Sequence, residues 1–93
     1  IVRKQDQVAR WGGDEFLVFL PETRAEGGRV VAEKIRARIL TTPFIYHEID
    51  IPVTVTLGVS ACDTNIGIGN CIRKADLALY TGKQAGKNRV IIG

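Results

Sequence analysis

Two adjacent glycines, Gly12 and Gly13, separate a polar segment from a continuous apolar run at residues 16–20. Glycine adopts the positive φ angles of a tight hairpin turn without the steric cost that other residues meet. The run Phe-Leu-Val-Phe-Leu ends at Pro21, and an uninterrupted apolar run is typical of a strand that is buried on both faces. The pattern therefore predicts a β-hairpin whose turn lies at the glycines and whose second strand enters the core.

A helix and a further strand are predicted after this hairpin. Thr23 and Glu26 have the spacing of a capping box, and apolar residues then recur at every fourth position, so we expect a helix over about residues 24–40. Pro43 follows this helix, and proline cannot continue one. The alternation of β-branched residues at Val53–Val59 predicts the strand.

A second helix is predicted to begin at Asn70, which is a suitable N-cap, and to end at Gly86, and a short strand follows at Val90–Ile92. Helices that alternate with strands behind a hairpin predict an α/β (α+β) fold, a mostly antiparallel sheet with flanking helices, built by residues 1–93 as one unit. The apolar face of the second helix is predicted to hold Cys71, Ile72, Ala75, Ala78 and Leu79.

The charge balance and the apolar content argue against several kinds of partner. Thirteen Lys and Arg residues against ten Asp and Glu residues give a net charge of +3, a mild excess that suits an anionic ligand such as a nucleotide. The basic residues form no dense stripe with interleaved aromatic residues, so we expect no nucleic-acid binding. No apolar stretch approaches the roughly 20 residues that span a bilayer, so we expect no direct membrane contact by this chain.

The cysteines and the histidine lack the spacing of a metal or redox centre. Cys62 and Cys71 do not form a CxxC motif, and His47 is the single histidine in the chain, so no zinc cluster is predicted. We expect reduced thiols that act as small packing groups, a histidine in a loop, and a cytoplasmic protein.

The segment Gly12–Phe16 reads Gly-Gly-Asp-Glu-Phe and places two adjacent carboxylates, Asp14 and Glu15, at the expected turn. Mg²⁺ or Mn²⁺ takes one or two protein carboxylates together with phosphate oxygens and water. The pattern therefore indicates a site for a nucleoside triphosphate with its divalent ion. Gly-Gly-Asp taken by itself is also typical of an ordinary hairpin turn, with Glu15 as a solvated neighbour.

With its flanking residues, the motif resembles the signature of the GGDEF family, the bacterial diguanylate cyclase domains. The sequence departs from the family at Thr81–Gly82 and at Lys87, where alanine and arginine are usual. The resemblance implies a partial nucleotidyl-cyclase-like palm that condenses two GTP molecules into cyclic di-GMP and releases diphosphate. It covers nearly the whole chain, through the further segments 9–11, 53–60, 75–80 and 83–90.

The resemblance also implies roles for the residues of the motif. Asp14 and Glu15 correspond to the metal-binding and catalytic positions, which hold divalent ions and help to activate the 3′-hydroxyl that attacks the α-phosphate. Gly12 and Gly13 resemble the positions that lie against the nucleotide. Cyclic di-GMP synthesis in the family requires a homodimer, so a second copy is an expected partner.

Basic residues outside the motif match two further family positions. Lys83 and Lys87 are four residues apart at the end of the second predicted helix and resemble residues that grip the triphosphate. Without the resemblance they indicate a solvated basic face that complements the helix dipole. Arg3 and Asp6 have the RxxD spacing of the family's product-inhibition site, where such side chains bind guanine edges of cyclic di-GMP. Lys34, on the first predicted helix, adds charge to that site.

The family's first strand, with another metal-binding Asp, and the helices before it are expected to precede Ile1. On the resemblance, residues 1–93 are then the C-terminal part of a single GGDEF domain, inactive alone, within a parent diguanylate cyclase. The strands expected at 16–20 and 53–59 would either pair with each other or leave open edges that draw in another chain.

Two other functions stay open on the sequence. One is a GGDEF module that makes no product but binds cyclic di-GMP or GTP as a regulator, and the other is a structural role in dimerisation. The acidic residue types at Asp14 and Glu15 favour the cyclase over both.

Overall fold

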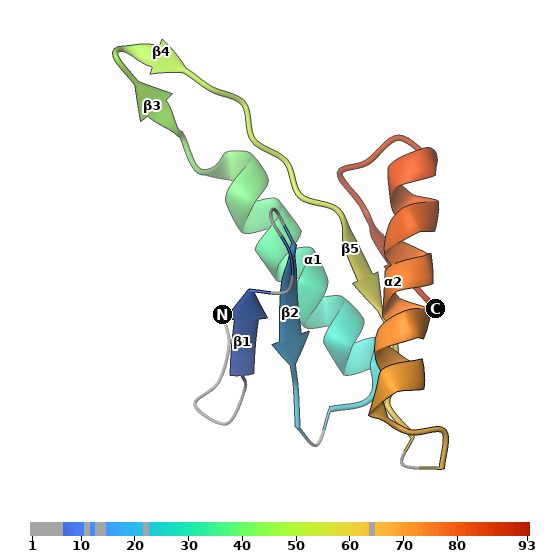
Figure 1. Cartoon of the computed structure of the whole chain (residues 1–93). Coiled ribbons are helices and arrows are strands. Elements are labelled where there is room, and N and C mark those ends of the chain that lie inside the picture. Colours follow the sequence, from blue (N-terminus) through green and yellow to red (C-terminus); the bar gives the residue numbers. More distant parts are fainter. Residues whose placement is uncertain (1–6, 11, 13–14, 22, 64) are drawn as a thin grey trace.

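The computed structural model describes residues 7–10, 12, 15–21, 23–63 and 65–93 of the chain, which is an elongated molecule of 50 × 31 × 23 Å. In this described part of the chain, two helices, one pair of strands between them and two hairpins make up the fold (Figure 1). Within the described residues, neither helix has the length and apolar character that a membrane span needs. In chain order the elements are β1 (Gln7–Arg10), β2 (Phe16–Phe19), α1 (Ala25–Thr41), β3 (Ile45–Tyr46), β4 (Ile49–Asp50), β5 (Leu57–Val59), α2 (Ile68–Gln84) and β6 (Val90–Ile92).

The predicted first hairpin is confirmed. Strands β1 and β2 are antiparallel, with Arg10 opposite Phe16, and the Gly12 N–H donates to the Glu15 carbonyl at 3.2 Å in the turn. The prediction that β2 is buried on both faces is wrong, because Phe16 is 68% exposed and Phe19 is 46% exposed. Within the described residues, the helices pack against strands β5 and β6 rather than against β1 or β2, and both rings stay partly open to solvent.

The centre of the molecule is the parallel pair β5–β6, with Leu57 opposite Val90, and both helices contact it. Figure 1 shows β5 between α1 and α2. Small residues let the layers approach closely, and the buried apolar residues in the described part of the chain are Ala32, Cys71 and Ala78. A core made of such small side chains buries little apolar area, so this chain by itself has a small stabilising term from the hydrophobic effect.

The α+β class is confirmed, and the strands of the described residues divide among three two-stranded sheets, of which two are antiparallel and β5–β6 is parallel. The predicted helix at 24–40 and the strand at Val90–Ile92 are confirmed, whereas the strand predicted at 53–59 is confined to Leu57–Val59. Closure of β2 onto β5, one of the two alternatives expected for these strands, does not occur, because they belong to separate sheets.

The hairpin β3–β4, which was not predicted from the sequence, stands away from the body of the molecule (Figure 1). His47 and Glu48 form its two-residue turn with φ angles of 50° and 66°, the backbone that two-residue hairpins favour. Such turns usually contain Asn-Gly or Asp-Gly. Because His47 and Glu48 are of other types, the sequence pattern did not indicate a hairpin turn here. The prediction of a loop histidine is confirmed.

Both predicted N-caps are wrong. The N-cap of α1 is Arg24, without a side-chain cap, because the Thr23 hydroxyl donates to the Pro21 carbonyl at 3.1 Å. Helix α2 follows Gly67, whose φ of 81° turns the chain into the helix, and Asn70 lies inside the first turns, where its amide donates to the Ile66 carbonyl at 2.6 Å. Helix α2 ends at Gln84, before Gly86 as predicted.

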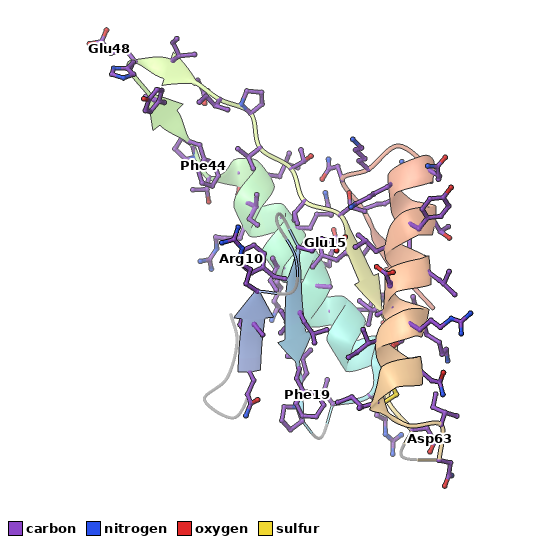
Figure 2. The ribbon with its side chains drawn as sticks, in the orientation of Figure 1. Arg10, Glu15, Phe19, Phe44, Glu48 and Asp63 are labelled. Carbon is purple, nitrogen blue, oxygen red and sulfur yellow. A yellow bond between two sulfur atoms is a disulfide. The ribbon has the colours of Figure 1, made fainter. Side chains whose placement is uncertain are left out.

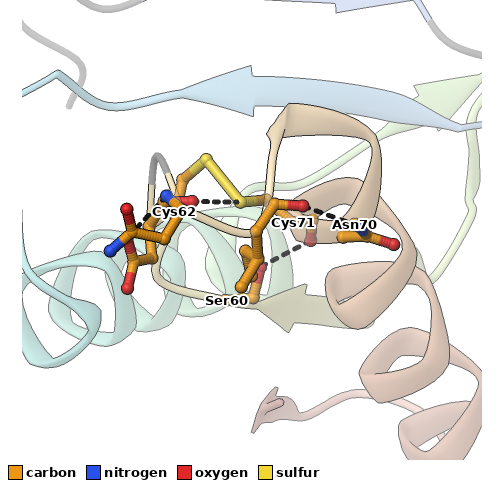
Figure 3. The surroundings of a disulfide bond; sticks show 7 residues. Ser60, Cys62, Asn70 and Cys71 are labelled. Carbon is orange, nitrogen blue, oxygen red and sulfur yellow. Dashed lines mark hydrogen bonds between the residues drawn. A yellow bond between two sulfur atoms is a disulfide. The ribbon is translucent and has the colours of Figure 1, made fainter.

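The expectation of two separate reduced thiols is also wrong, because Cys62 and Cys71 form a disulfide bond (Figure 3). They are nine positions apart, but α2 starts beside the end of β5, which brings their Cα atoms to 5.1 Å. The Ser60 hydroxyl donates to the Cys71 carbonyl at 2.7 Å and joins the same two elements. A disulfide that closes a loop of this size contributes about 2–3 kcal/mol to stability.

Candidate functional site

An ion pair joins two of the residues singled out in the sequence. The Lys83 Nζ atom lies 3.6 Å from Oε2 of Glu15, and their side chains are 41% and 34% exposed. Glu15 comes from the end of the first hairpin turn and Lys83 from the last turn of α2. The fold thus brings an acidic and a basic side chain together from positions that are distant in sequence, and leaves both accessible to solvent.

The local structure around Glu15 depends on the hairpin turn. Arg10 donates from Nε to the Gly12 carbonyl at 3.3 Å, and the hydrogen bond from Gly12 to the Glu15 carbonyl closes the turn. Figure 2 shows Arg10 and Glu15 on opposite sides of the hairpin, with Glu15 on the side of β5. A partly exposed carboxylate is therefore held on the side of β5 by backbone that is itself hydrogen-bonded.

Lys87 does not share the helix end with Lys83, which corrects the predicted i, i+4 pair. Helix α2 ends at Gln84, and Lys87 lies in the following turn with a φ of 62°. Its N–H donates to the Gly82 carbonyl at 3.0 Å. Because Gly82 precedes Lys83, this bond still anchors the backbone of Lys87 beside the last turn of the helix.

The remaining predicted site residues are placed as follows. Gly12 is half-buried in the hairpin turn. Lys34 lies on α1, as predicted; its side chain is exposed and lines an open groove of about 270 Å³ with its helix neighbours. The predictions for Asp14, Gly13, Arg3 and Asp6 lie outside the described residues.

Helix α1 carries two parallel ion pairs. Arg29 donates from Nε and Nη2 to Glu26 at 2.9 and 2.7 Å, and Arg36 donates from the same two atoms to Glu33. These hydrogen bonds hold the pKa of each glutamate below its ordinary value and raise the pKa of each arginine. Arg36 differs from Arg29 in a third bond, from Nη1 to Oδ1 of Asn88 at 2.9 Å.

Arg36 and Asn88 are functional candidates that sequence reasoning missed. They are 52 positions apart, and a local pattern cannot report that a helix and a distant turn will meet. The bond connects α1 with the turn that carries Lys87, so it belongs to the surroundings of the site.

Among the described residues of the motif, Glu15 offers one carboxylate, partly exposed and paired with Lys83, as a ligand for a divalent cation. Within the described part of the chain, no group of three His, Cys, Asp or Glu side chains is close enough to hold a metal ion, and Asp14 is outside that part. A partly exposed carboxylate is the ligand type that Mg²⁺ and Mn²⁺ prefer, and these ions complete their coordination with water and phosphate oxygens.

Known proteins resemble this chain closely in sequence. The family model for the diguanylate cyclase GGDEF domain matches residues 1–89. Diguanylate cyclase DgcP of Pseudomonas aeruginosa is 38% identical over 89 residues, a match that covers 96% of this chain and 13% of the relative. Diguanylate cyclase A of Treponema denticola is 38% identical over 91 residues, which is 97% of this chain and 24% of the relative.

The fold has known relatives as well. The crystal structure of the GGDEF domain of DgcB from Caulobacter crescentus, in complex with c-di-GMP, superposes with a TM-score of 0.91 at 26% identity. That match covers 98% of this chain and 55% of the solved one. This chain thus spans only part of the length of each relative, whereas the match to the family model extends over nearly all of this chain. The chain belongs to the GGDEF family of diguanylate cyclase domains.

Proposed function

We propose that the chain is the C-terminal part of the GGDEF domain of a diguanylate cyclase, which joins two GTP molecules into cyclic di-GMP. The observation that carries this proposal is the Glu15–Lys83 pair, because it combines a carboxylate of the signature motif with a cation beside it. One group suits a divalent ion and the other suits phosphate.

The reaction forms two phosphodiester bonds and releases two diphosphates. The 3′-hydroxyl of each GTP attacks the α-phosphate of the other, so two copies of the domain must face each other, each with one nucleotide. Asp14 and Glu15 would hold Mg²⁺ or Mn²⁺, which makes a ribose hydroxyl more acidic and neutralises phosphate charge. Gly12 and Gly13 would lie against the nucleotide, and Lys83 and Lys87 would bind the triphosphate.

The Glu15–Lys83 ion pair supports this assignment because its contribution to stability is small. Both side chains are more than a third exposed, and such pairs contribute only about 0–1 kcal/mol. Each charge can therefore exchange its protein partner for a ligand at little cost. A phosphate oxygen can replace Glu15 at the Lys83 ammonium, and a divalent cation can replace Lys83 at the carboxylate.

A turnover assay tests the proposal. The protein that carries this chain within its whole GGDEF domain is incubated with GTP and Mg²⁺, and nucleotides are separated by chromatography. We expect cyclic di-GMP, with two diphosphates for each molecule formed. Binding of GTP or cyclic di-GMP without any product would instead identify a regulatory module and overturn the cyclase.

Product inhibition is the second part of the proposal, with Arg3, Asp6 and Lys34 in contact with cyclic di-GMP. Arg3→Ala is expected to raise the inhibition constant roughly tenfold, because one bidentate arginine–guanine contact is lost, and to leave the initial rate within about twofold. Product titration measures both values. Lys4→Ala is the matched control, since it removes the neighbouring positive charge. If the inhibition constants of Arg3→Ala and Lys4→Ala are equal, Arg3 does not belong to the inhibition site.

A further inference from the structure

The turn between α2 and β6 has an unusual backbone. Three successive residues have positive φ, namely Gly86 at 120°, Lys87 at 62° and Asn88 at 49°. Glycine after a helix end is common in this conformation, and asparagine tolerates it, but lysine does so at a cost. Backbone of this kind persists only where surrounding contacts fix it, and it is concentrated at functional sites.

Contacts from three parts of the chain fix this turn. Helix α2 accepts the Lys87 N–H at the Gly82 carbonyl, at 3.0 Å. The segment before β5 accepts the Asn88 N–H at Oγ1 of Thr56, also at 3.0 Å. Helix α1 reaches the Asn88 side chain through Arg36, at 2.9 Å. The backbone of Lys87 is therefore held on both sides by hydrogen bonds.

Arg36 is itself rigidly placed. Its Nε donates to Oε1 of Glu33 at 2.9 Å and its Nη2 donates to the same oxygen, while its side chain is 20% exposed. The planar guanidinium can donate hydrogen bonds to Glu33 from one edge and to Asn88 from another. The hydrogen bond from Arg36 lowers the pKa of Glu33, so the carboxylate that orients Arg36 stays charged.

We propose that Arg36 is a positioning residue for the nucleotide site. Through Asn88 it holds the turn in its left-handed conformation and so fixes Lys87 beside Lys83, where the two ammonium groups act on one triphosphate. The inference rests on the proposed role of these lysines. It assigns to α1 a part in substrate binding, although Arg36 touches no substrate.

The test is a double-mutant cycle in the protein that carries this chain within its whole GGDEF domain. Arg36→Gln removes the guanidinium, and Asn88→Gly removes the acceptor while keeping a residue that adopts positive φ freely. Each is expected to raise KM for GTP roughly tenfold with kcat changed less than about threefold, because substrate binding is weakened more than chemistry. The double variant is expected to match the singles, since both act through one contact. Initial rates are used, before product accumulates.

Arg29→Gln is the matched control, because Arg29 makes the same bond pattern to Glu26 on the same helix and, within the described residues, none to the turn. Its KM is expected to equal that of the wild type. Arg36→Lys, which keeps the charge and the N–H donors of a single ammonium nitrogen, is expected to restore part of the affinity. If Arg36→Gln does not fold, the Asn88→Gly variant alone tests the positioning role. A KM for GTP of Asn88→Gly equal to that of the wild type would then overturn the proposal.

The outcomes separate this inference from the proposed function. A wild-type protein without cyclase activity would overturn both. An active wild type whose Arg36→Gln variant has the KM of Arg29→Gln would overturn the positioning role and leave the cyclase in place. Multiplying effects in the double variant would show that Arg36 does not act through Asn88, and would also overturn it.

Discussion

Glu15→Gln, made in the protein that carries this chain within its whole GGDEF domain, is expected to lower cyclic di-GMP formation by about 10³-fold or more. The amide keeps the size of the carboxylate but loses the charge that holds a divalent ion, so stabilisation of the transition state is lost. Stability should change little, since the pair with Lys83 is partly exposed and such pairs contribute about 0–1 kcal/mol. Product formation is measured as an initial rate, with thermal unfolding in parallel.

Glu26→Gln is the control for this variant. Glu26 is also ion-paired, with Arg29 at 2.7 Å, but it lies on α1, away from the proposed site. Its substitution removes a paired carboxylate of the same kind and should leave the rate unchanged. A Glu15→Gln protein that keeps more than about a tenth of the activity would contradict the metal-binding role.

Gly58→Ala is expected to cause the largest loss of stability. A Cβ atom at this position would overlap the Ala75 carbonyl oxygen and lie 2.5 Å from the Leu79 amide nitrogen, and backbone atoms of α2 cannot move aside alone. Helix α2 must shift from β5, which costs about 3 kcal/mol or more. Thermal unfolding followed by circular dichroism should show a Tm lowered by about 10–20 °C.

Gly69→Ala provides the comparison, because an added Cβ there meets nothing within 4 Å and the residue is helical. Alanine is preferred over glycine in helices by roughly 0.5–1 kcal/mol, so this variant should be slightly more stable than the wild type. Equal Tm values for the two variants would show that α2 does not pack on Gly58 as the structure places it.

Local patterns predicted the hairpin at the glycines, both helices and the last strand, because each depends on neighbouring residues. The exposure of Phe16 could not be predicted from the apolar run. Such a run indicates that a strand is able to be buried on both faces, but it does not indicate whether another element of the chain packs against those faces. The turn at His47 and Glu48 was missed because its residue types are unusual for its backbone.

The candidate site was predicted in part for the same reason. Glu15 and Lys83 were identified through the family's motifs, and the structure brings them together. Whether Glu15 and Lys83 meet depends on where the fold places the first hairpin relative to α2, which no single segment encodes. The same holds for Arg36 with Asn88 and for Cys62 with Cys71, pairs that only the folded chain reveals.

The disulfide makes part of this chain a covalent ring. The described residues between Cys62 and the start of α2 are exposed, so this segment offers a protease a place to cut, but one cut there opens the ring without releasing a fragment. The two sections of the nicked chain, one ending after β5 and the other starting with α2, separate only when a thiol also reduces the bond. Mass spectrometry would show this state of the chain. The intact mass would rise by the mass of one water on digestion, and reduction would give two separate fragment masses.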